Sequence, residues 1–161
     1  MLHEKITKEL LPLKKRQHDK PTKFSYRDVE RLIDTQLTGA IVLTGRARRS
    51  LKKAEYQDPQ LVWRAVELLT TYYKLTEPEF RRRCRELGLD YRRSITDVSA
   101  GMYGEKYFVD YNGKRRRLDF HLTNGSDREP RKCLRIYFFH DDDNERIVIG
   151  HLPSHLSNSK S

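Results

Sequence analysis

The sequence contains little that could form a disulfide framework, a metal centre or a membrane span. Its 161 residues include two cysteines, Cys84 and Cys133, which belong to no CxxC pair and have no neighbours at zinc-ligand spacing. We therefore expect two reduced, mostly buried thiols, no metal site and no cofactor. No apolar run approaches a membrane span, and residues 1–20 carry charges where a signal peptide needs an apolar core. These absences predict a cytoplasmic protein.

Hydrophobic residues are also scarce, at 36% of the chain. This content is enough for the core of one ordinary domain with a small appendage. Positive charge, in contrast, is abundant, because 33 Lys and Arg against 23 Asp and Glu give a net charge of +10. So basic a chain favours a polyanionic partner, with nucleic acid as the leading candidate. An anionic membrane surface or an acidic protein would meet the same charge.

A basic N-terminal stretch precedes the first segment in which apolar residues have helical spacing. Residues 1–23 are expected to form an arm, which is a solvated tail, a basic strap on nucleic acid or a segment that docks on a partner. Ser25 then begins a helix that Gly39 ends, and the apolar run 40–44 follows as a buried strand. The chain is accordingly divided into an arm with an accessory helix (1–38), an α+β domain (39–156) and a disordered tail (157–161).

Three further helices are expected before the middle of the chain. The first begins near Arg46 and has only a narrow apolar stripe. Asp58 followed by Pro59 begins a long second helix, whose broad apolar face makes it the main contributor to the core. A third helix begins with a capping box at Thr76 and ends at Gly88.

Strand signals dominate the last third. Residues 89–105 indicate a connecting loop, and Asn112-Gly113 predicts a tight hairpin turn. Residues 115–121 and 132–140 alternate with a period of two, so that one face of each strand is apolar and faces the core. If these two strands pair, the opposite face exposes guanidinium, phenol, carboxylate and imidazole groups. Such a face can hold a phosphodiester and move protons.

Each of these polar features also has a purely structural interpretation. Antiparallel sheets commonly expose one face to water, so a polar alternation need not mark a site. Residues 141–144 lack the spacing of a calcium-binding loop and indicate a hairpin turn, with His140 at the surface beside it. Arg135 is expected on the face opposite the apolar residues of its strand, where it could pair with Asp119 as a structural ion pair.

Positive charge is concentrated on the helix near Arg46 and on the strand that begins at Arg115. The candidate nucleic-acid-binding residues are Arg46, Arg48, Arg49, Lys52, Lys53, Arg115 and Arg117. The helix has five cations before its first acidic residue, Glu55, so its charged face either contacts phosphate or is solvated. We expect its exposed face to contribute to binding and not to stability. The arginines of residues 81–85 form a second basic surface, either solvated or facing phosphate.

Two segments carry a resemblance to a known family. They are AIVLTGRARRSLKK, which leads into the long second helix, and CLRIYFF followed by RIVIG. Through them, residues 40–155 resemble the RelE/ParE toxin superfamily of bacterial type II toxin–antitoxin modules. The resemblance implies an α+β fold with N-terminal helices packed on a mostly antiparallel C-terminal sheet. It also implies a basic protein that cleaves RNA or blocks another nucleic-acid enzyme, with an antitoxin-like partner.

The RNA-cleaving members of that superfamily need no metal. A base takes the proton of the 2′-hydroxyl group, cations stabilise the phosphorane, and an acid protonates the leaving oxygen. The resemblance carries Arg135 over as phosphate stabiliser and places His151 or His155 near the acid or base. His121 and Tyr137 join the catalytic candidates from strand alternation alone. Each histidine could instead be structural, and Pro153 with the lack of a third ligand argues against a metal site.

The sequence therefore predicts a toxin-like, metal-independent endoribonuclease that acts on RNA. The alternative is a non-catalytic nucleic-acid-binding or regulatory subunit of a bacterial toxin–antitoxin or phage-defence assembly. A third hypothesis is inhibition of a protein such as a topoisomerase. In each case the expected partners are nucleic acid, RNA before DNA, or a protein, and no membrane.

Overall fold

Most helices precede most strands in the chain. The computed structural model describes residues 23–94, 101–125 and 129–156. The helices are α2 (Tyr26–Gln36), α3 (Gly45–Lys52), α4 (Pro59–Leu69), the 3-10 helix η1 (Tyr72–Lys74), α5 (Glu77–Glu86) and the 3-10 helix η2 (Gly101–Tyr107). The strands are β1 (Ile41–Leu43), β2 (Asp90–Arg93), β3 (Phe108–Tyr111), β4 (Lys114–Arg117), β5 (Phe120–Asn124), β6 (Leu134–Asp141) and β7 (Arg146–His151). The expected α+β class is confirmed.

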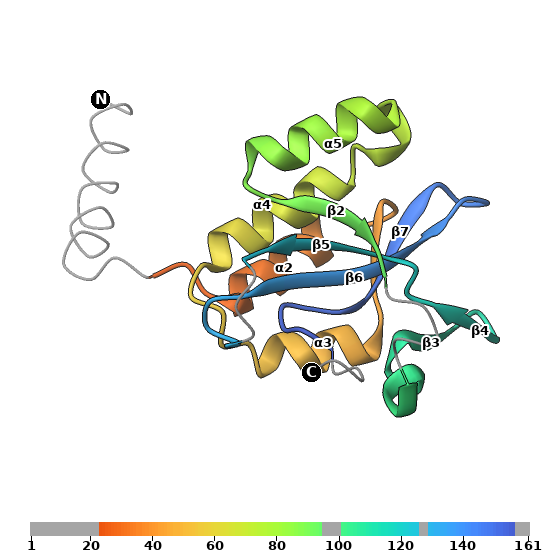
Figure 1. The fold of residues 1–161 in the computed structure, drawn as a ribbon. Coiled ribbons are helices and arrows are strands. Elements are labelled where there is room, and N and C mark those ends of the chain that lie inside the picture. Colours follow the sequence, from red (N-terminus) through yellow and green to blue (C-terminus); the bar gives the residue numbers. More distant parts are fainter. Residues whose placement is uncertain (1–22, 95–100, 126–128, 157–161) are drawn as a thin grey trace, which may run out of the picture.

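Five strands form one mixed sheet in the order β1-β7-β6-β5-β2 (Figure 1). β1 runs parallel to β7, whereas the other neighbouring strands are antiparallel. A parallel pair needs a long connection, which here includes the helices α3, α4 and α5. β3 and β4 pair with each other as a separate hairpin, called the β3–β4 arm below. The sheet is therefore mostly antiparallel, with one parallel pair at its edge.

Local signals set the helix boundaries. The backbone N–H of Ser25 donates to the carboxylate of Asp28 at 2.8 Å, which fixes the first turn of α2. Gly39 has a φ of +88°, a left-handed conformation that favours glycine, and this turn leads the chain into β1. The hydroxyl of Thr44 accepts from the N–H of Ala47 and begins α3.

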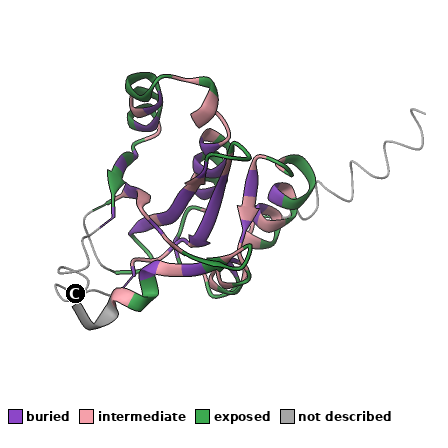
Figure 2. Cartoon of the chain, turned by 90° about the vertical axis from the view of Figure 1, so that its right-hand side faces the viewer, coloured by how far each residue is buried: buried purple, intermediate pink, exposed green. Residues whose placement is uncertain are grey.

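The main core lies between the helices and one face of the sheet. Val29 and Ile33 of α2 are buried in it, together with Leu134, Ile136 and Phe138 of β6. Figure 2 shows this buried layer in purple along the sheet. α2 thus shares one core with the sheet, although the boundary predicted after residue 38 stays a prediction.

The predicted arm (up to residue 22) and the predicted tail (157–161) lie outside the described residues. Among the residues that are described, no helix is long and apolar enough to cross a membrane.

A second, smaller core covers part of the other face of the sheet. Tyr137 and Phe139 of β6 are buried there, against Val148 of β7 and against Tyr107 and Leu118 below the β3–β4 arm. The prediction that this face is exposed throughout is therefore wrong. The β3–β4 arm folds back over the sheet and covers this face with apolar side chains from another part of the chain. The alternating pattern of a single strand cannot reveal such a contact.

The strand predicted over 115–121 is two strands in two sheets. β4 ends at Arg117, and β5 begins at Phe120. Between them, the backbone N–H of Leu118 donates to the carbonyl of Tyr107 at 2.7 Å, and its side chain is fully buried. The period of two continues through this bend, which is why the sequence pattern did not indicate it.

Two other segments differ from the sequence prediction. The loop predicted over 89–105 contains β2, an edge strand in which Tyr91 is the buried residue, and also part of η2. The long helix predicted from Asp58, whose apolar face was expected to include Tyr72 and Tyr73, is shorter: α4 ends at Leu69, and these two residues belong to the short helix η1. The hairpin at Asn112-Gly113 is confirmed, with φ angles of 50° and 76°.

Candidate functional site

The sheet register places several predicted site residues in one row. Arg92 of β2 is opposite His121 of β5, which is opposite Tyr137 of β6, which in turn is opposite His151 of β7. In the neighbouring row, Arg135 is opposite Thr123. Because residues opposite one another share a face of the sheet, these side chains belong to the face away from the main core.

Arg135 lies on the central strand β6, as predicted, and its guanidinium is held by backbone oxygens. Its Nη1 donates to the carbonyls of Leu134 at 2.9 Å and Gly125 at 3.0 Å. Its backbone N–H donates to the carbonyl of Pro153 at 2.8 Å. The alternative ion pair with Asp119 is not formed between these two described residues. Arg135 therefore anchors the end of the β5–β6 connection.

Tyr137 is only 2% exposed. Its hydroxyl accepts a hydrogen bond from the backbone N–H of Leu156 at 3.1 Å, so residues 152–156, called the C-terminal turn below, lie over the phenol. Burial raises the pKa of Tyr137. In this structure the phenol positions the C-terminal turn and is closed to a substrate.

His121 and His151 lie on opposite sides of Tyr137. Their rings are 5.2 and 6.1 Å from the Tyr137 ring, centroid to centroid. With one strand between theirs, their backbones are about 10 Å apart, and the two imidazoles do not converge on one phosphate. Burial lowers the pKa of each to about 4, with smaller contributions from Arg135 at His121 and Arg46 at His151. Both rings are therefore neutral at pH 7.

The two histidines differ in their hydrogen bonds. The Nε2 atom of His151 is 2.9 Å from the hydroxyl of Ser154 in the C-terminal turn. The Nδ1 atom of His121 is buried and has no hydrogen-bond partner in the structure as described. His121 thus has an unused polar atom, whereas His151 is held by the turn.

A basic hollow of about 560 Å³ lies between α3, η2 and the C-terminal turn, and is called the α3 groove below. Its described lining comprises Arg46, Arg49, Ser50, Lys53, Glu105, Lys106, His151, Ser154, His155 and Leu156. Four of these residues are Lys or Arg and one is a carboxylate. The groove therefore combines cations with two of the predicted catalytic histidines.

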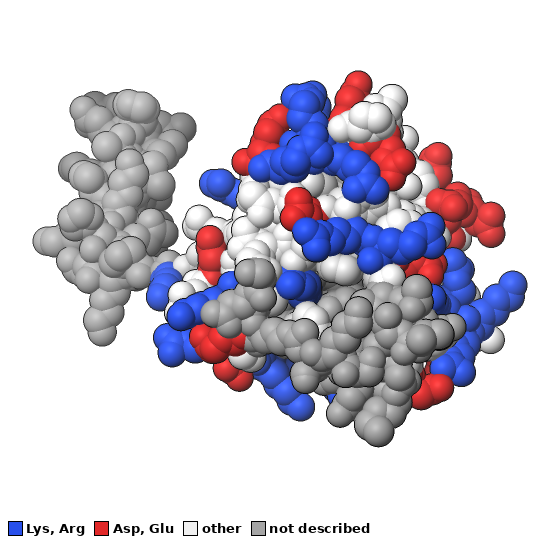
Figure 3. All heavy atoms as spheres, viewed as in Figure 1, with Lys and Arg blue, Asp and Glu red and all other residues white. Residues whose placement is uncertain are grey.

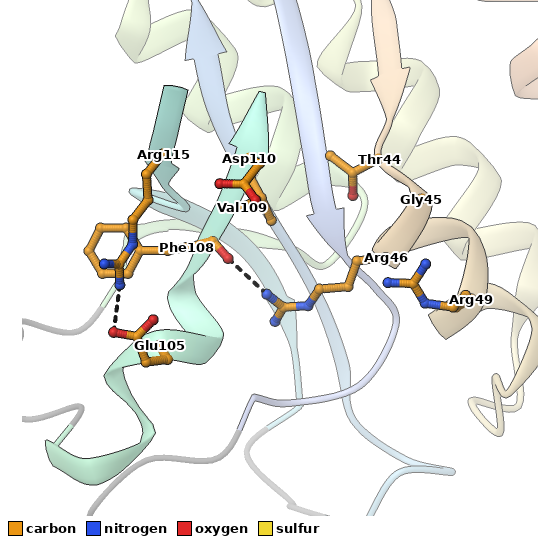
Figure 4. A pocket seen from close by; sticks show the side chains of 9 residues that line it. All are labelled: Thr44, Gly45, Arg46, Arg49, Glu105, Phe108, Val109, Asp110 and Arg115. Carbon is orange, nitrogen blue, oxygen red and sulfur yellow. Dashed lines mark hydrogen bonds and ion pairs between the residues drawn. The ribbon is translucent and has the colours of Figure 1, made fainter. Parts of the chain in front are cut away.

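A second hollow of about 520 Å³ continues from the groove toward the β3–β4 arm. Arg46, Arg49 and Glu105 line both hollows. Figure 4 shows Arg46 and Arg49 reaching from α3 toward Phe108 and Arg115 of the arm. The two hollows are neighbours, and the side chain of Arg46, which lines both, spans from α3 to the β3–β4 arm.

The side chains of two arginines in α3 make contacts that hold the fold together. The guanidinium of Arg46 donates to the backbone carbonyls of Phe108, at 3.1 Å, and Lys106, and so fastens α3 to the arm. Arg48 makes ion pairs with Glu30 at 2.9 Å and Asp34 at 2.8 Å, both on α2. Arg48 therefore faces α2, and its charge is offset there.

The remaining predicted nucleic-acid-binding residues differ in their exposure and contacts. Arg49 and Lys53 are exposed, line the α3 groove and make no hydrogen bond or ion pair with a described residue. Lys52 is exposed but lines none of the described hollows. Arg115 pairs with Glu105 at 2.7 Å, and its guanidinium lies 4.1 Å from the centroid of the Phe108 ring. Arg117 is half-buried and also lines none of them.

Sequence reasoning missed three residues near these histidines. Lys106 and Ser154 line the α3 groove, and Arg92 shares the row with His121. Arg92 falls in the predicted loop 89–105, so no periodicity pointed to it, and Lys106 follows that loop directly at the start of the predicted hairpin. The proximity of Ser154 to His151, three residues earlier, was the available signal.

His140 is half-buried and does not lie free at the surface as predicted. Its ring stacks on Tyr72, with centroids 4.1 Å apart, and its Nε2 is 3.3 Å from the hydroxyl of Tyr91. Burial lowers the pKa of His140, and the carboxylates of Asp142, Asp119 and Glu77 oppose this shift. His140 therefore belongs to an aromatic cluster that joins η1 to the sheet.

Cys84 and Cys133 are both buried, as predicted, and burial raises the pKa of Cys84 to about 11. Within residues 23–94, 101–125 and 129–156, no three His, Cys, Asp or Glu side chains form a group that could hold a metal ion.

No protein-family model, curated protein or solved structure compared with this chain matches it. The geometry of the described residues is therefore the basis for assigning a function.

Proposed function

We propose that this protein binds RNA in the α3 groove through the phosphate backbone. The observation that supports this best is that Arg49 and Lys53 are exposed and have no ion-pair or hydrogen-bond partner among the described residues. They lie in a groove that Arg46 and Lys106 also line. Glu105, the one carboxylate of the described lining, is offset by Arg115 at 2.7 Å. A groove with this excess of positive charge attracts a polyanion and releases its counterions on binding.

Much of the positive charge elsewhere is offset by neighbouring acids. Arg81 and Arg82 of α5 pair with Glu77 and Glu86 at 3.0 and 2.9 Å. In Figure 3, blue and red side chains lie together over α5 at the top of the molecule. Such exposed pairs give a mixed surface, which attracts polyanions less than an unpaired cluster does.

Two adjacent lysines test the binding site. Lys53 lines the α3 groove and Lys52 does not, although both are exposed. In a fluorescence anisotropy assay with single-stranded RNA, Lys53→Glu should weaken binding about tenfold and lower the salt slope by about 1. Lys52→Glu changes the net charge equally and should have a much smaller effect. Equal losses in both variants would mean that net charge, and not the groove, governs binding.

A second candidate is metal-independent RNA cleavage, because His151 and His155 line the same groove as the cations. Burial keeps His151 neutral, as a base must be, since its pKa is lowered to about 4. It would take the proton of a 2′-hydroxyl group, Arg49 would stabilise the phosphorane, and His155 would protonate the leaving oxygen. In this form of the proposal Arg135 does not contact the reacting phosphate.

The resemblance to the RelE/ParE superfamily, drawn from the sequence segments, is compatible with this candidate. Under it, the protein would be a toxin-like endoribonuclease with an antitoxin-like protein partner. In the non-catalytic alternative, the protein binds RNA in the same α3 groove but does not cleave it.

Cleavage is tested separately from binding. His151→Gln should abolish cleavage of a single-stranded RNA while the affinity changes less than about threefold. A chelator should leave the rate unchanged, and an all-DNA strand should not be cut because it has no 2′-hydroxyl. If the wild-type protein binds RNA without cutting it, the non-catalytic subunit is the correct assignment.

A further inference from the structure

A third hollow, of about 380 Å³, lies beside the C-terminal turn and is called the β5 pocket below. Arg92 of β2, Thr123 and Asn124 of β5, Arg135 of β6 and His155 of the turn contribute to its lining. It is lined by none of the cations of α3. The pocket is therefore distinct from the α3 groove.

His155 is common to the α3 groove and the β5 pocket. The α3 groove in turn shares Arg46 and Arg49 with the hollow beside the β3–β4 arm. Successive hollows thus lead from Arg115 on the arm, past α3 and the C-terminal turn, to Arg92 on the edge strand β2.

The β5 pocket has the chemistry to bind a phosphate group. Arg135 is fixed by the hydrogen bonds of its Nη1 and backbone N–H, while its Nε and Nη2 make no hydrogen bond with a described residue. Nitrogen atoms left over on a fixed guanidinium suit an anion, because little side-chain entropy is lost on binding. Arg92 adds a second cation, partly offset by Asp90 at 3.2 Å.

His121 is a neighbour of the β5 pocket in the sheet but does not line it. It lies directly across the sheet from Arg92, and its buried Nδ1 has no hydrogen-bond partner among the described residues. The charges of Arg135, Arg92 and His155 all act on its ring. The phosphate contacts of the β5 pocket are therefore assigned to Arg135 and Arg92, which line it.

We propose that the RNA strand of the proposed function extends past His155, with one phosphate in the β5 pocket, and that the substrate is an extended single strand. This inference rests on RNA binding in the α3 groove. Each hollow has the size of a small-ligand site, so a whole nucleotide enters it only when its base is freed from the pairing and stacking of a duplex. At the arm, the guanidinium of Arg115, 4.1 Å from the Phe108 ring, presents a flat face on which an unpaired base stacks.

Two adjacent arginines test this proposal. Arg92 and Arg93 are both exposed on β2, but Arg92 faces His121 and lines the β5 pocket, whereas Arg93 lies over the Phe120 ring on the other face. Arg92→Glu and Arg93→Glu change the net charge equally. Anisotropy titrations use the full-length protein with single-stranded RNAs of about three and about ten nucleotides and with an RNA duplex of the longer sequence.

We expect Arg92→Glu to weaken binding of the longer strand about tenfold and to leave the shorter strand, held by the α3 groove, within about twofold. Arg93→Glu should leave both within about twofold, and the duplex should bind more weakly than the longer strand. Equal effects of the two variants, equal effects on both lengths, or preference for the duplex would overturn the extended path while Lys53→Glu still weakens binding. If no RNA binds at all, the proposed function itself fails.

Discussion

Arg48 of α3 holds the carboxylate of Asp34 on α2 with two hydrogen bonds, of 2.8 and 2.9 Å. Arg49, the next residue, has no such partner among the described residues and lines the α3 groove. Neighbouring arginines in one basic helix therefore have different roles, one joining two helices and the other available to phosphate.

Substitution of each arginine by alanine should separate these roles. Arg48→Ala should lower the free energy of unfolding by about 1 kcal/mol, the range of a partly exposed ion pair, and the melting temperature by about 2–4 °C. Its RNA affinity should be nearly unchanged. Arg49→Ala should weaken RNA binding without a loss of stability, as thermal unfolding and anisotropy would show. A stable Arg48→Ala protein with weakened RNA binding would contradict these assignments.

The absence of a side chain at Gly150 of β7 leaves room for the side chain of Leu118. A Cβ atom at Gly150 would lie 2.5 Å from the Cδ2 atom of Leu118, whose side chain is fully buried. Gly150→Ala should therefore lower the free energy of unfolding by about 1–3 kcal/mol through overpacking. Gly45→Ala, where the nearest atom is an Arg49 nitrogen at 3.5 Å, is the control and should be nearly neutral.

A double variant checks the cause. If the clash with Leu118 is responsible, Gly150→Ala and Leu118→Ala combined should cost less than the two single changes added together. Urea unfolding of the four proteins measures this coupling. Additive effects would show that Gly150 matters for some reason other than its contact with Leu118.

Stability should fall in weak acid because three histidines have lowered pKa values. The pKa is lowered to about 4 at His121 and His151, and is also lowered at His140, in each case mainly by burial. The unfolded chain, with histidine pKa values of about 6.5, takes up protons first as the pH falls. Their contribution is therefore complete above about pH 6.5 and declines toward pH 4.

Urea unfolding between about pH 7.5 and pH 5 measures this decline. Replacing His140 by Phe, which keeps the ring against Tyr72, should make the decline shallower without lowering stability at acidic pH. A free energy of unfolding that stays constant over this interval would contradict the burial of these imidazoles.

Arg135 is expected to contribute to stability through backbone contacts and not through Asp119. Arg135→Ala removes the hydrogen bonds to Leu134 and Gly125 and should cost about 1–3 kcal/mol. Asp119→Asn should leave the melting temperature unchanged. Parallel losses of stability in the two variants would instead support the Arg135–Asp119 ion pair considered from the sequence.

Ile136→Asp, which places a charge in the main core, should unfold the protein.

Local signals predicted much of the fold. Ser25 and Gly39 bounded α2, Asn112-Gly113 defined the arm hairpin, and the alternation around Arg135 identified β6 and its buried face. These features depend on residues close together in the chain. β2 was missed because an edge strand with one buried residue, Tyr91, has almost no periodicity.

The site was predicted only in part, because its geometry depends on contacts between distant segments. Alternation placed His121 and Arg135 on one face, but it could not show that the C-terminal turn covers Tyr137. The charge of α3 was evident, yet the pairing of Arg48 with residues of α2 was not. The availability of each cation to a partner therefore depends on contacts between segments that are distant in the sequence.

The most direct test of RNA binding in the α3 groove is an NMR titration of the isotope-labelled protein with a short single-stranded RNA. The account predicts that the largest chemical-shift changes occur at Arg49, Lys53 and the imidazole of His151, and that the α5 amides around Arg82 stay unchanged. Shifts confined to α5, or none in the α3 groove at an RNA concentration that saturates binding, would contradict it.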